Sequence, residues 1–574
     1  MQKYILIICE KPQAARRIAY AIADVLPAKK NFHGIPYWEL KHKDKRIVVA
    51  SAAGHLFGLQ EKKESNEWPV FDVEWKASKG FHANYISALR YLTKNASEFV
   101  IACDYDIEGE LIGYNVLRFI CKTEKAKRMK FSTLTKKDLI KSFENMEETI
   151  NYGQAYAGET RHYLDWFYGI NLSRGLMQAI RKTGVKKILS IGRVQGPALS
   201  LIVAREKEIK NFTPEKYWNI YLIVEGVKLK YKKEIKAKEE AEKFLQYKNK
   251  KAKIETKKET QELEPLPPFD LTTLQIESFR LFGFSPAYTL KIAQNLYLRG
   301  LISYPRTSSQ KLPPTIGAKG ILEKLKKQFS ALAKFAVREK PIEGKKTDPA
   351  HPAIFPTGEY GKLSKEERKV YELIVKRFIS CFSENALIER KKIIAEKDFM
   401  TEGKRTLRKG WLEVYPLTIE IKELPDLDGT YTVEDVIIEE KETQPPKRFT
   451  PASIIAELEK RKLGTKATRA EIIEKLYKRG YISGIKITAT NLGIAVVDIL
   501  SSISPLILDE KLTRDFEEKL QKIEQEKNKE KIIKKQKEIL EEAKEKLIRI
   551  AKDFKEKESK IGEMLIKGSE SFSS

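Results

Sequence analysis

The stretch Asp104-Tyr105-Asp106-Ile107-Glu108-Gly109 constrains the fold more than any other part of this chain. It follows the apolar run 99–103, which is typical of a buried strand, and precedes 110–120, which has helical character. Because residues two apart on an extended backbone face the same way, Asp104, Asp106 and Glu108 are expected to converge on one point. Clustered carboxylate oxygens suit Mg²⁺, which keeps water or substrate phosphate in its remaining positions. The stretch therefore predicts a metal site where a strand ends.

Two other interpretations of this stretch are weaker. A lone D-x-D is more often a solvated acidic turn. The pattern D-x-D-x-E-G also matches the opening of an EF-hand calcium loop. However, position twelve of that loop is Asn115 rather than Glu, and a strand rather than a helix precedes it.

A second acidic tip lies near the N-terminus. The apolar run 4–9 (YILIIC) is followed by Glu10-Lys11-Pro12 and then by a helical stretch at 14–26. Strand, acidic tip and helix is the layout of an α/β sheet that binds ligands at the carboxyl ends of its strands. If the two strands are neighbours, Glu10 joins the Asp104 cluster around one metal, with Lys11 beside it. Taken alone, Glu10-Lys11-Pro12 is an ordinary surface turn.

Together the two tips resemble the toprim domain, the Mg²⁺ module of topoisomerases, bacterial primases and some nucleases. The segment 300–307 (GLISYPRT) is similar to the active-site segment of type IA DNA topoisomerases, in which Tyr304 matches the nucleophile and Arg306 the adjacent cation. Tyr-Pro often marks only a turn, but here Pro305 favours an extended Tyr304. A phenol with a pKa of about 10 needs nearby cations to attack phosphate at neutral pH.

Four further segments resemble motifs of the same family and occur in its order. They are 161–165 (RHYLD) and 192–197 (GRVQGP), similar to strand-binding motifs, 351–357 (HPAIFPT), similar to the segment whose histidine contacts the scissile phosphate, and 463–469 (LGTKATR), a late motif. The residues at the matching places are Arg161, Asp165, Arg193, Gln195, His351, Thr468 and Arg469. Each segment alone has a structural explanation, such as an exposed helix face. Together they make the chain resemble a type IA topoisomerase of the I/III kind, archaeal in appearance, from residue 1 to about 525.

Composition favours a polyanionic partner. Lys and Arg number 108 against 80 Asp and Glu, which gives a net charge of +28 and favours DNA through counterion release. A basic membrane-surface protein would show the same balance, but no segment is long and apolar enough to span a bilayer, and no signal peptide is recognisable. Tyr and Phe residues within the basic stretches suit base stacking.

The four cysteines, Cys9, Cys103, Cys121 and Cys381, are scattered and form no C-x-x-C pair. This pattern predicts reduced, structural cysteines and a cytoplasmic, chromosome-associated protein. It also predicts no tetracysteine zinc module of the kind that many relatives carry at the C-terminus. Abundant Lys, Glu and Ile indicate a thermophilic source.

The changing residue pattern predicts a multidomain fold of α/β, α and β parts. The expected domains are a toprim α/β domain at 1–148, a helical DNA-binding domain at 149–212 plus 441–574, a β arch at 213–268 plus 394–440, and a helical domain with Tyr304 at 269–393. Because strand-rich segments lie on both sides of the Tyr304 region, we expect one β-domain made of two pieces that closes a ring. Asp428-Gly429 predicts a hairpin turn within it.

An internal similarity predicts two related helical units. The segment 296–303 (LYLRGLIS) recurs as 476–483 (LYKRGYIS), each at the end of a helix–turn–helix pattern. We therefore expect 272–303 and 452–483 to be two copies of one winged-helix-like DNA-binding unit. The alternative is that helix–Gly–helix segments share such endings by composition. The second copy lacks Tyr-Pro-Arg, so only the first could be catalytic.

The resemblance implies an ATP-independent type IA topoisomerase. Tyr304 would become joined to the 5′-phosphate of a cleaved single strand, and the released 3′-hydroxyl would reverse the reaction after strand passage. Asp104, Asp106 and Glu108 would hold Mg²⁺, and Glu10 would bind metal or move a proton. Lys11, Arg306 and His351 would supply positive charge. One ester replaces another, and the sequence has no G-x-x-x-x-G-K-[ST] loop for ATP. Expected partners are single-stranded and negatively supercoiled DNA, with the protein a monomer and a helicase partner left open.

Two rival functions remain at this level. A toprim nuclease or primase would use the same acidic cluster without the tyrosine, and a covalent protein–DNA adduct would eliminate it. A non-enzymatic chromosome-architecture protein would account for the charge and the helical units but not for the strand-end carboxylates. The sequence does not distinguish relaxation from decatenation or RNA strand passage.

Overall fold

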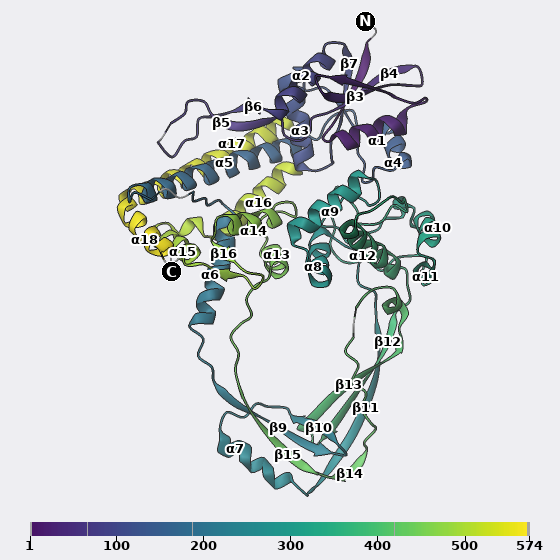
Figure 1. Cartoon of the computed structure of the whole chain (residues 1–574), viewed down its shortest axis with the longest axis vertical. Helices are drawn as coiled ribbons and strands as arrows, with labels where there is room; N and C mark the ends of the chain where they lie inside the picture. Colours follow the sequence, from purple (N-terminus) through teal and green to yellow (C-terminus); the bar gives the residue numbers. More distant parts are fainter. Residues whose placement is uncertain (1–2, 66, 186–187, 418, 571–574) are drawn as a thin grey trace.

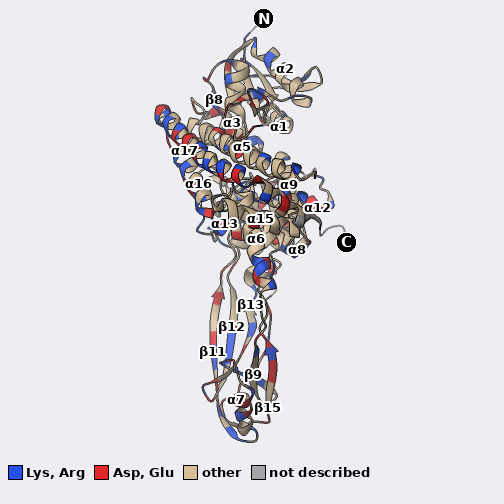
Figure 2. Ribbon diagram, turned by 90° about the vertical axis from the view of Figure 1, so that its left-hand side faces the viewer, with Lys and Arg blue, Asp and Glu red and all other residues tan. Residues whose placement is uncertain are grey.

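The computed structural model describes residues 3–65, 67–185, 188–417 and 419–570, which form a ring (Figure 1). An α/β domain and two helical regions make up the upper part of the ring, and long strands close it below. Seen from the side, the strands form a narrow projection beneath the helical regions (Figure 2). The predicted combination of an α/β domain, helical domains and a β arch that closes a ring is confirmed.

The N-terminal domain is built on a six-stranded sheet in the order β2-β3-β4-β1-β7-β8. Strand β1 (Tyr4–Cys9) is buried along its whole length and pairs in parallel with β4 (Lys45–Ser51) and β7 (Ala96–Ala102). Burial on both faces explains why YILIIC is continuously apolar rather than alternating. The other elements are α1 (Pro12–Ile22), β2 (Ala28–Phe32), β3 (Ile35–His42), β5 (Phe57–Glu61), β6 (Val73–Ala77), α2 (Phe81–Thr93), α3 (Ile107–Val116), a π-helical turn (Leu117–Cys121), β8 (Lys127–Arg128) and α4 (Lys136–Glu144).

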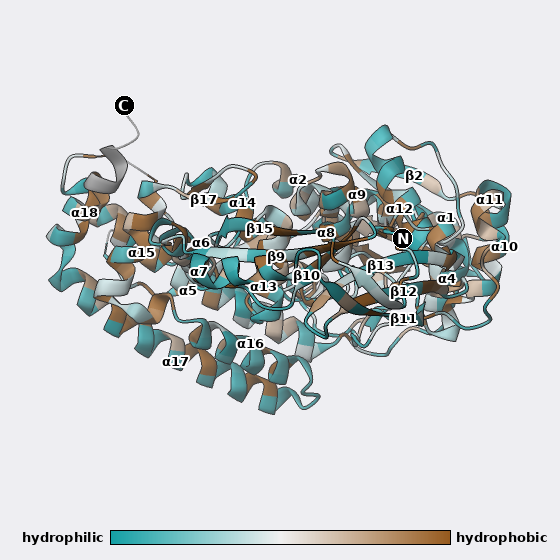
Figure 3. Cartoon of the chain, turned by 90° about the horizontal axis from the view of Figure 1, so that it is seen from below, coloured by the Kyte–Doolittle hydropathy of each residue, from teal (hydrophilic) through white to brown (hydrophobic). Residues whose placement is uncertain are grey.

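The second region combines helices from two distant parts of the chain. Helix α5 (Tyr152–Arg181) packs along α16 (Glu510–Glu524) and α17 (Lys529–Glu556). Apolar residues recur along α17 at helical spacing (Figure 3), and its exposed side mixes Lys with Glu (Figure 2), as expected of an amphipathic helix. The remaining elements are α6 (Gln195–Lys210), α13 (Pro451–Lys460), α14 (Arg469–Lys478), β16 (Ile482–Ser483), β17 (Thr488–Ala489), α15 (Asn491–Ile503), a 3₁₀ turn (Pro505–Ile507) and α18 (Glu558–Glu570).

The region that carries Tyr304 is helical and packs against the N-terminal domain. Buried residues of α1 and β1 belong to the same hydrophobic cluster as buried residues near Tyr304, so the two domains share apolar surface that is kept from water. The helices are α8 (Leu271–Phe282), α9 (Pro286–Leu298), a 3₁₀ turn (Pro314–Ile316), α10 (Ala318–Gln328), α11 (Ser330–Ala333) and α12 (Lys365–Cys381).

The arch is one antiparallel sheet in the order β14-β11-β12-β13-β10-β9-β15. Strands from both sides of the Tyr304 region join it: β9 (Lys216–Val224), β10 (Val227–Tyr231), β11 (Lys251–Leu263), β12 (Ala386–Ala395), β13 (Phe399–Arg408), β14 (Gly429–Thr432) and β15 (Asp435–Glu442). A short helix α7 (Lys238–Glu242) and 3₁₀ turns at Lys243–Tyr247 and Gly410–Glu413 complete the region. The Tyr304 region is thus inserted between two pieces of one sheet.

Two details of the arch differ from the sequence predictions. Strand β12 begins at Ala386, before the boundary predicted at 394, because Ala386 pairs in register with Leu263 of β11. The predicted Asp428-Gly429 hairpin is wrong, because β14 begins at Gly429 and pairs with β11 rather than with the segment that precedes Asp428. Asp428 instead accepts a hydrogen bond from the Thr256 amide at 2.8 Å, which ties the start of β14 to β11.

The two similar helical units face each other across the ring's upper part. Helices α8 and α9 pack against α13 and α14. After α14 the chain forms the β16–β17 ribbon, with Ile482 opposite Ala489, as a wing would. After α9, Ile302 makes only an isolated bridge with Pro356. The units therefore share a helix pair and differ in the segment that comes after the second helix.

Candidate active site at a domain junction

Two buried carboxylates meet at the carboxyl edge of the N-terminal sheet. Cys9 and Ala102 are opposite each other in β1 and β7, which brings Glu10 and Asp104 to the same edge. Lys11 Nζ lies 2.8 Å from Glu10 Oε1 and 2.9 Å from Asp104 Oδ2. The two acids are 8% and 3% exposed. The neighbouring strands thus bring Glu10, Lys11 and Asp104 together.

Burial and neighbouring charges shift the pKa values of the two acids in opposite directions. Burial, together with the negative charge of Asp104, raises the pKa of Glu10 to about 7. Burial also disfavours the charge of Asp104, but the Lys11 ammonium outweighs it and lowers the Asp104 pKa. At neutral pH Asp104 is therefore ionised, whereas Glu10 exchanges a proton readily, as a general acid or base must.

Asp106 turns the chain from β7 into α3. Its side chain accepts from the Gly109 amide at 2.8 Å, which makes it the N-cap of the helix. A Cβ at Gly109 would lie 2.1 Å from the Asp104 carbonyl oxygen, so the tight turn requires glycine. This close approach explains the glycine that ends the D-x-D-x-E-G stretch.

Tyr304 lies at the junction with its hydroxyl against the strand-end carboxylates. The hydroxyl donates to Asp106 Oδ2 at 2.5 Å, and the backbone amide donates to the Ser132 carbonyl at 2.8 Å. The residue is 1% exposed. Burial, reinforced by the charges of Asp106 and Asp104, raises the Tyr304 pKa well above its usual value. In this closed ring the phenol is therefore neutral.

Arg306 and His351 flank Tyr304. Burial opposes the Arg306 charge, but Tyr304 and Asp106 outweigh it and raise the Arg306 pKa. Arg306 Nε is buried without a hydrogen-bond partner among the residues that the structure describes. Such an orphaned, charged donor suits an anionic ligand.

His351 is held in its neutral form. Its ring lies 4.5 Å from that of Tyr304, centroid to centroid. Nε2 donates to the Tyr105 carbonyl at 2.8 Å, and Nδ1 accepts from the Ser132 hydroxyl at 3.0 Å. Burial lowers the His351 pKa. Both ring nitrogens are thus occupied by groups of the N-terminal domain, which fixes the tautomer.

The prediction that Glu108 joins the acidic cluster is wrong. Helix α3 begins at Ile107, so the two-residue alternation of a strand ends before Glu108. Its carboxylate accepts instead from His55 Nε2 at 2.9 Å and His162 Nε2 at 3.0 Å. Within the described ranges, His55, Glu108 and His162 are also the sole His, Cys, Asp or Glu trio whose ligand atoms all lie within 4.8 Å of one another. Glu108 therefore does not converge with Asp104 and Asp106.

The predicted strand-binding motifs of α5 and α6 come together. Arg193 is buried and pairs with Asp165 Oδ1 at 3.2 Å and Glu517 Oε1 at 2.8 Å. Arg161 also lies near Asp165, with Nε and Oδ2 3.8 Å apart. Gln195, the first residue of α6, donates to the Ser190 carbonyl at 3.2 Å.

The late motif joins this group. Thr465 Oγ1 accepts from Arg161 at 3.1 Å. Thr468 caps the turn by accepting from the Thr465 amide at 3.1 Å. Arg469 bonds the carbonyls of Leu463 and Gly464, each at 3.1 Å, and borders a cavity of about 650 Å³. Arg469 therefore holds the motif's own loop, whereas Arg161 links it to α5.

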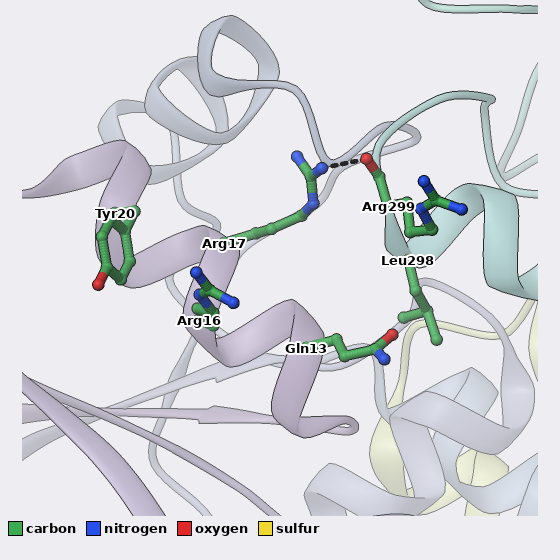
Figure 4. Close-up of a pocket in the computed structure, with 6 residues that line it drawn as sticks. All are labelled: Gln13, Arg16, Arg17, Tyr20, Leu298 and Arg299. Carbon is green, nitrogen blue, oxygen red and sulfur yellow. Dashed lines mark hydrogen bonds between the residues drawn. The ribbon is translucent and has the colours of Figure 1, made fainter. Parts of the chain in front are cut away.

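Ion pairs and a hydrogen bond from an arginine tie the Tyr304 region to both neighbouring regions. Lys466 pairs with the buried Asp348. Lys346 Nζ lies 3.0 Å from both Asp270 Oδ2 and Glu459 Oε1. On the N-terminal side, Arg17 of α1 donates to the carbonyl of Arg299, the residue after α9 (Figure 4). The junction that holds Tyr304 is thus closed by contacts on two sides.

Several of these contacts involve residues that the sequence patterns did not single out. Tyr297 donates to Asp104 Oδ1 at 3.1 Å, Ser132 holds His351, and Asp348 receives Lys466. Each joins segments far apart in the chain, so no local spacing indicates it. The sequence did offer one signal, for the helix start: an Asp before an apolar helical stretch, as at Asp106, is a common N-cap.

The described residues include no helix with the length and apolar character needed to cross a membrane.

Comparisons with known proteins cover both halves of the site. A family model described as DNA topoisomerase matches residues 149–535, and one described as Toprim domain matches 5–134. DNA topoisomerase 1 of Methanocaldococcus jannaschii is 49% identical, over 98% of this chain and 76% of its own length. That of Pyrococcus horikoshii is 45% identical, over 98% and 86%. Full-length topoisomerase I from Thermotoga maritima superposes with a TM-score of 0.74 at 26% identity, over 94% of this chain and 90% of that one.

Proposed function

Because this chain belongs to the type IA DNA topoisomerases, enzymes that relax DNA by strand cleavage and passage, we propose that Tyr304 is its nucleophile. The observation that carries the assignment is the Tyr304 hydroxyl, 2.5 Å from Asp106 at the edge where Glu10 and Asp104 also lie. The phenol oxygen attacks a phosphodiester and the bond from phosphorus to the 3′ oxygen breaks. The tyrosine is left on the 5′-phosphate, and the reverse step reseals the strand.

The protons and charges of this step have suitable groups nearby. The phenol proton leaves toward Asp106, which already accepts it. Glu10, with a pKa raised to about 7 by burial, gives a proton to the departing 3′ oxygen and takes it back on religation. Arg306 and Lys11 stabilise the charge on the phosphate. His351 contributes by positioning, through its ring contact with Tyr304.

The carboxylates at this edge fit Mg²⁺. Asp104, Asp106 and Glu10 offer hard oxygen ligands at the ends of β1 and β7, and Mg²⁺ prefers a few carboxylates plus substrate phosphate. Lys11 offsets only part of the negative charge of Glu10 and Asp104, and Asp106 lies against the Tyr304 hydroxyl, so the three acids together retain negative charge for the ion. Bound there, Mg²⁺ would position the DNA for religation. Glu108 is engaged by two histidines and is left out of this set.

The DNA strand is proposed to reach Tyr304 from the helical region. Arg161 lies where the motifs of α5 and 463–469 meet, and Arg193 and Asp165 fix the geometry behind it. Thr468 and Arg469 hold the loop of the late motif, and Gln195 the start of α6. The substrate is single-stranded or negatively supercoiled DNA, consistent with the net charge of +28.

We further propose the division of labour among the domains. Residues 1–148 carry the metal site, 149–212 with 441–574 bind the strand, the arch spans the ring, and the inserted region moves Tyr304. Because one chain closes the ring, a monomer suffices for strand passage. The free cysteines suit the cytoplasm, where the chromosome lies. A helicase partner remains an open expectation.

Tyr304→Phe tests the assignment. It removes only the hydroxyl, so folding and strand binding should persist while the covalent adduct disappears. A single-stranded oligonucleotide labelled on the 3′ side of the cleavage site reports the 5′-phosphotyrosyl adduct on a denaturing gel. Tyr288→Phe, at an exposed tyrosine of α9, is the matched control and should form the adduct normally. An adduct in Tyr304→Phe would refute the assignment, and a nuclease or architecture protein would form none in the native chain.

A further inference from the structure

A groove of about 890 Å³ separates the N-terminal domain from the Tyr304 region. One wall is formed by residues of 130–145, including the start of α4, and the other by residues of 313–324 and 349–359. In Figure 1, α4 and α10 lie to the right of this junction, whereas α5, α13 and α16 of the strand-binding region lie to its left. The groove is therefore on the other side of the junction from the strand-binding motifs.

The groove reaches the catalytic centre directly. Tyr105 and Ser132 line it, and they are the two residues that hold the ring nitrogens of His351. The Ser132 carbonyl also accepts from the Tyr304 amide at 2.8 Å. A chain that leaves the Tyr304 hydroxyl in this direction enters the groove at once.

The walls carry an excess of positive charge. The charged lining residues are Lys130, Lys136, Lys137, Lys141, Lys324, Asp138 and Glu359. Lys324 pairs with Glu359, and the Asp138 carboxylate accepts from the Thr133 hydroxyl at 2.9 Å. Both acids are thus engaged within the walls.

Three lysines of α4 remain free for a ligand. Lys136, Lys137 and Lys141 are exposed and form no ion pair with any residue that the structure describes. Ser132, Thr135 and Thr315 add hydroxyl groups to the lining. Unpaired ammonium groups with hydroxyls beside them suit the phosphates and sugars of a single strand.

We propose that this groove binds the part of the cleaved strand that lies 3′ of the scissile phosphate. The inference rests on the proposed function, in which Tyr304 retains the 5′-phosphate, so the attached fragment starts at Tyr304 and runs onward. The strand-binding motifs lie to one side of Tyr304, which leaves the groove for this fragment. Because α4 belongs to the N-terminal domain, its lysines contact the fragment only while the ring is closed.

Binding measurements in a Tyr304→Phe background test the groove without cleavage. Fluorescence anisotropy would monitor oligonucleotides with a constant 5′ part and a 3′ part that grows from one to about eight nucleotides, within the usual site sizes of single-strand grooves. Affinity should rise with the 3′ length. Replacing Lys136, Lys137 and Lys141 by Glu should remove most of that rise. The slope of log K against log salt should fall by up to about 2, at about 0.7 per lost phosphate contact.

The arch supplies a matched control. Lys233, Lys236 and Lys243 are exposed and lie on the arch, near α7 at the far end of the ring. Replacing them by Glu changes the net charge equally and should leave the dependence on 3′ length intact. Circular dichroism would verify that both triple variants are folded.

Three results would overturn the proposal. The first is an affinity that does not depend on 3′ length in the Tyr304→Phe background with all lysines intact. The others are an equal loss of this length dependence in the arch variant, or a loss of affinity in the groove variant that appears only when the 5′ part is lengthened. Failure of the proposed function is separate, because it shows as a missing or 3′-linked adduct in the chain with Tyr304 intact. The anisotropy result does not depend on that adduct.

Discussion

Breaking the ion pair between Lys466 and Asp348 should loosen the closed ring. Asp348 belongs to the Tyr304 region and Lys466 to the strand-binding region, and the carboxylate is almost fully buried. Burial alone would raise the Asp348 pKa, but Lys466 and the amides of Ser308 and Ala350 lower it to about 2. Lys466→Met removes the ammonium and keeps the aliphatic stem.

The shift of the Asp348 pKa gives the free energy that its partners contribute. The difference between 3.8 and about 2 corresponds to roughly 2 to 3 kcal/mol at 1.36 kcal/mol per pH unit. Lys466 makes the largest contributions that lower the pKa, and the backbone donors remain in Lys466→Met, so the larger part of this, about 1 to 2 kcal/mol, is lost. The population of the opened junction should therefore rise about tenfold.

Amide hydrogen exchange measures this opening at the junction itself. The Tyr304 amide donates to the Ser132 carbonyl across the junction, whereas the neighbouring Ser303 amide donates to Phe355 within its own region. In Lys466→Met the Tyr304 amide should exchange about tenfold faster and the Ser303 amide at its native rate. Lys460→Met, at an exposed lysine of α13, is the control and should change neither.

The contribution of Asp348 to closure of the ring should be lost at low pH. Because the Asp348 pKa is depressed by folding, its contribution is complete above pH 3.8 and is lost as the pH falls toward about 2. Corrected for intrinsic exchange, Tyr304 protection in the native chain should fall across that window and stay flat in Asp348→Asn. Equal Tyr304 exchange in Lys466→Met and the native chain would refute the reasoning.

Three further outcomes are expected. Replacing Asp104 and Asp106 together by Ala should impair plasmid relaxation far more than single-strand binding, which rests on Lys and Arg; normal relaxation in Mg²⁺ would make the acidic cluster structural. Negatively supercoiled plasmid should relax without ATP, and fully paired positive supercoils should not, because underwinding favours strand opening; equal rates would contradict this. Arg128→Met leaves Glu110 buried and unpaired and should destabilise the fold by about 3–5 kcal/mol in thermal unfolding; a loss below about 1 kcal/mol would contradict that role.

The edge where Glu10 and Asp104 meet was predictable from local pattern. Two apolar runs of strand length, each ending in an acid and succeeded by a helix, imply parallel strands whose carboxyl ends share one edge. The pairing of β1 with β7 bears this out. The placement of Tyr304 and His351 beside that edge came only from motif resemblance, because no periodicity links positions so far apart.

The errors have a common physical origin in the competition between local and long-range interactions. Glu108 was placed by strand alternation, but Asp106 caps a helix and rotates the next residues away. Asp428-Gly429 leads into β14 instead of closing a hairpin, because sheet pairing places β14 beside β11. Residues such as Tyr297 and Ser132 act across domains, so their partners exist only after the chain has folded.

In the closed ring the groups proposed for catalysis bind one another or neighbouring side chains. Tyr304 donates to Asp106, Tyr297 to Asp104, and His351 is held by Ser132. Burial keeps the Tyr304 phenol neutral in the ligand-free ring, which protects it from unproductive reaction until a phosphate is bound. Arg306 is the exception, since its Nε has no partner among the described residues. A phosphate that pairs with Arg306 gains a charge-assisted bond beside the proposed nucleophile, whose proton Asp106 is placed to accept, so binding of DNA would itself complete the site.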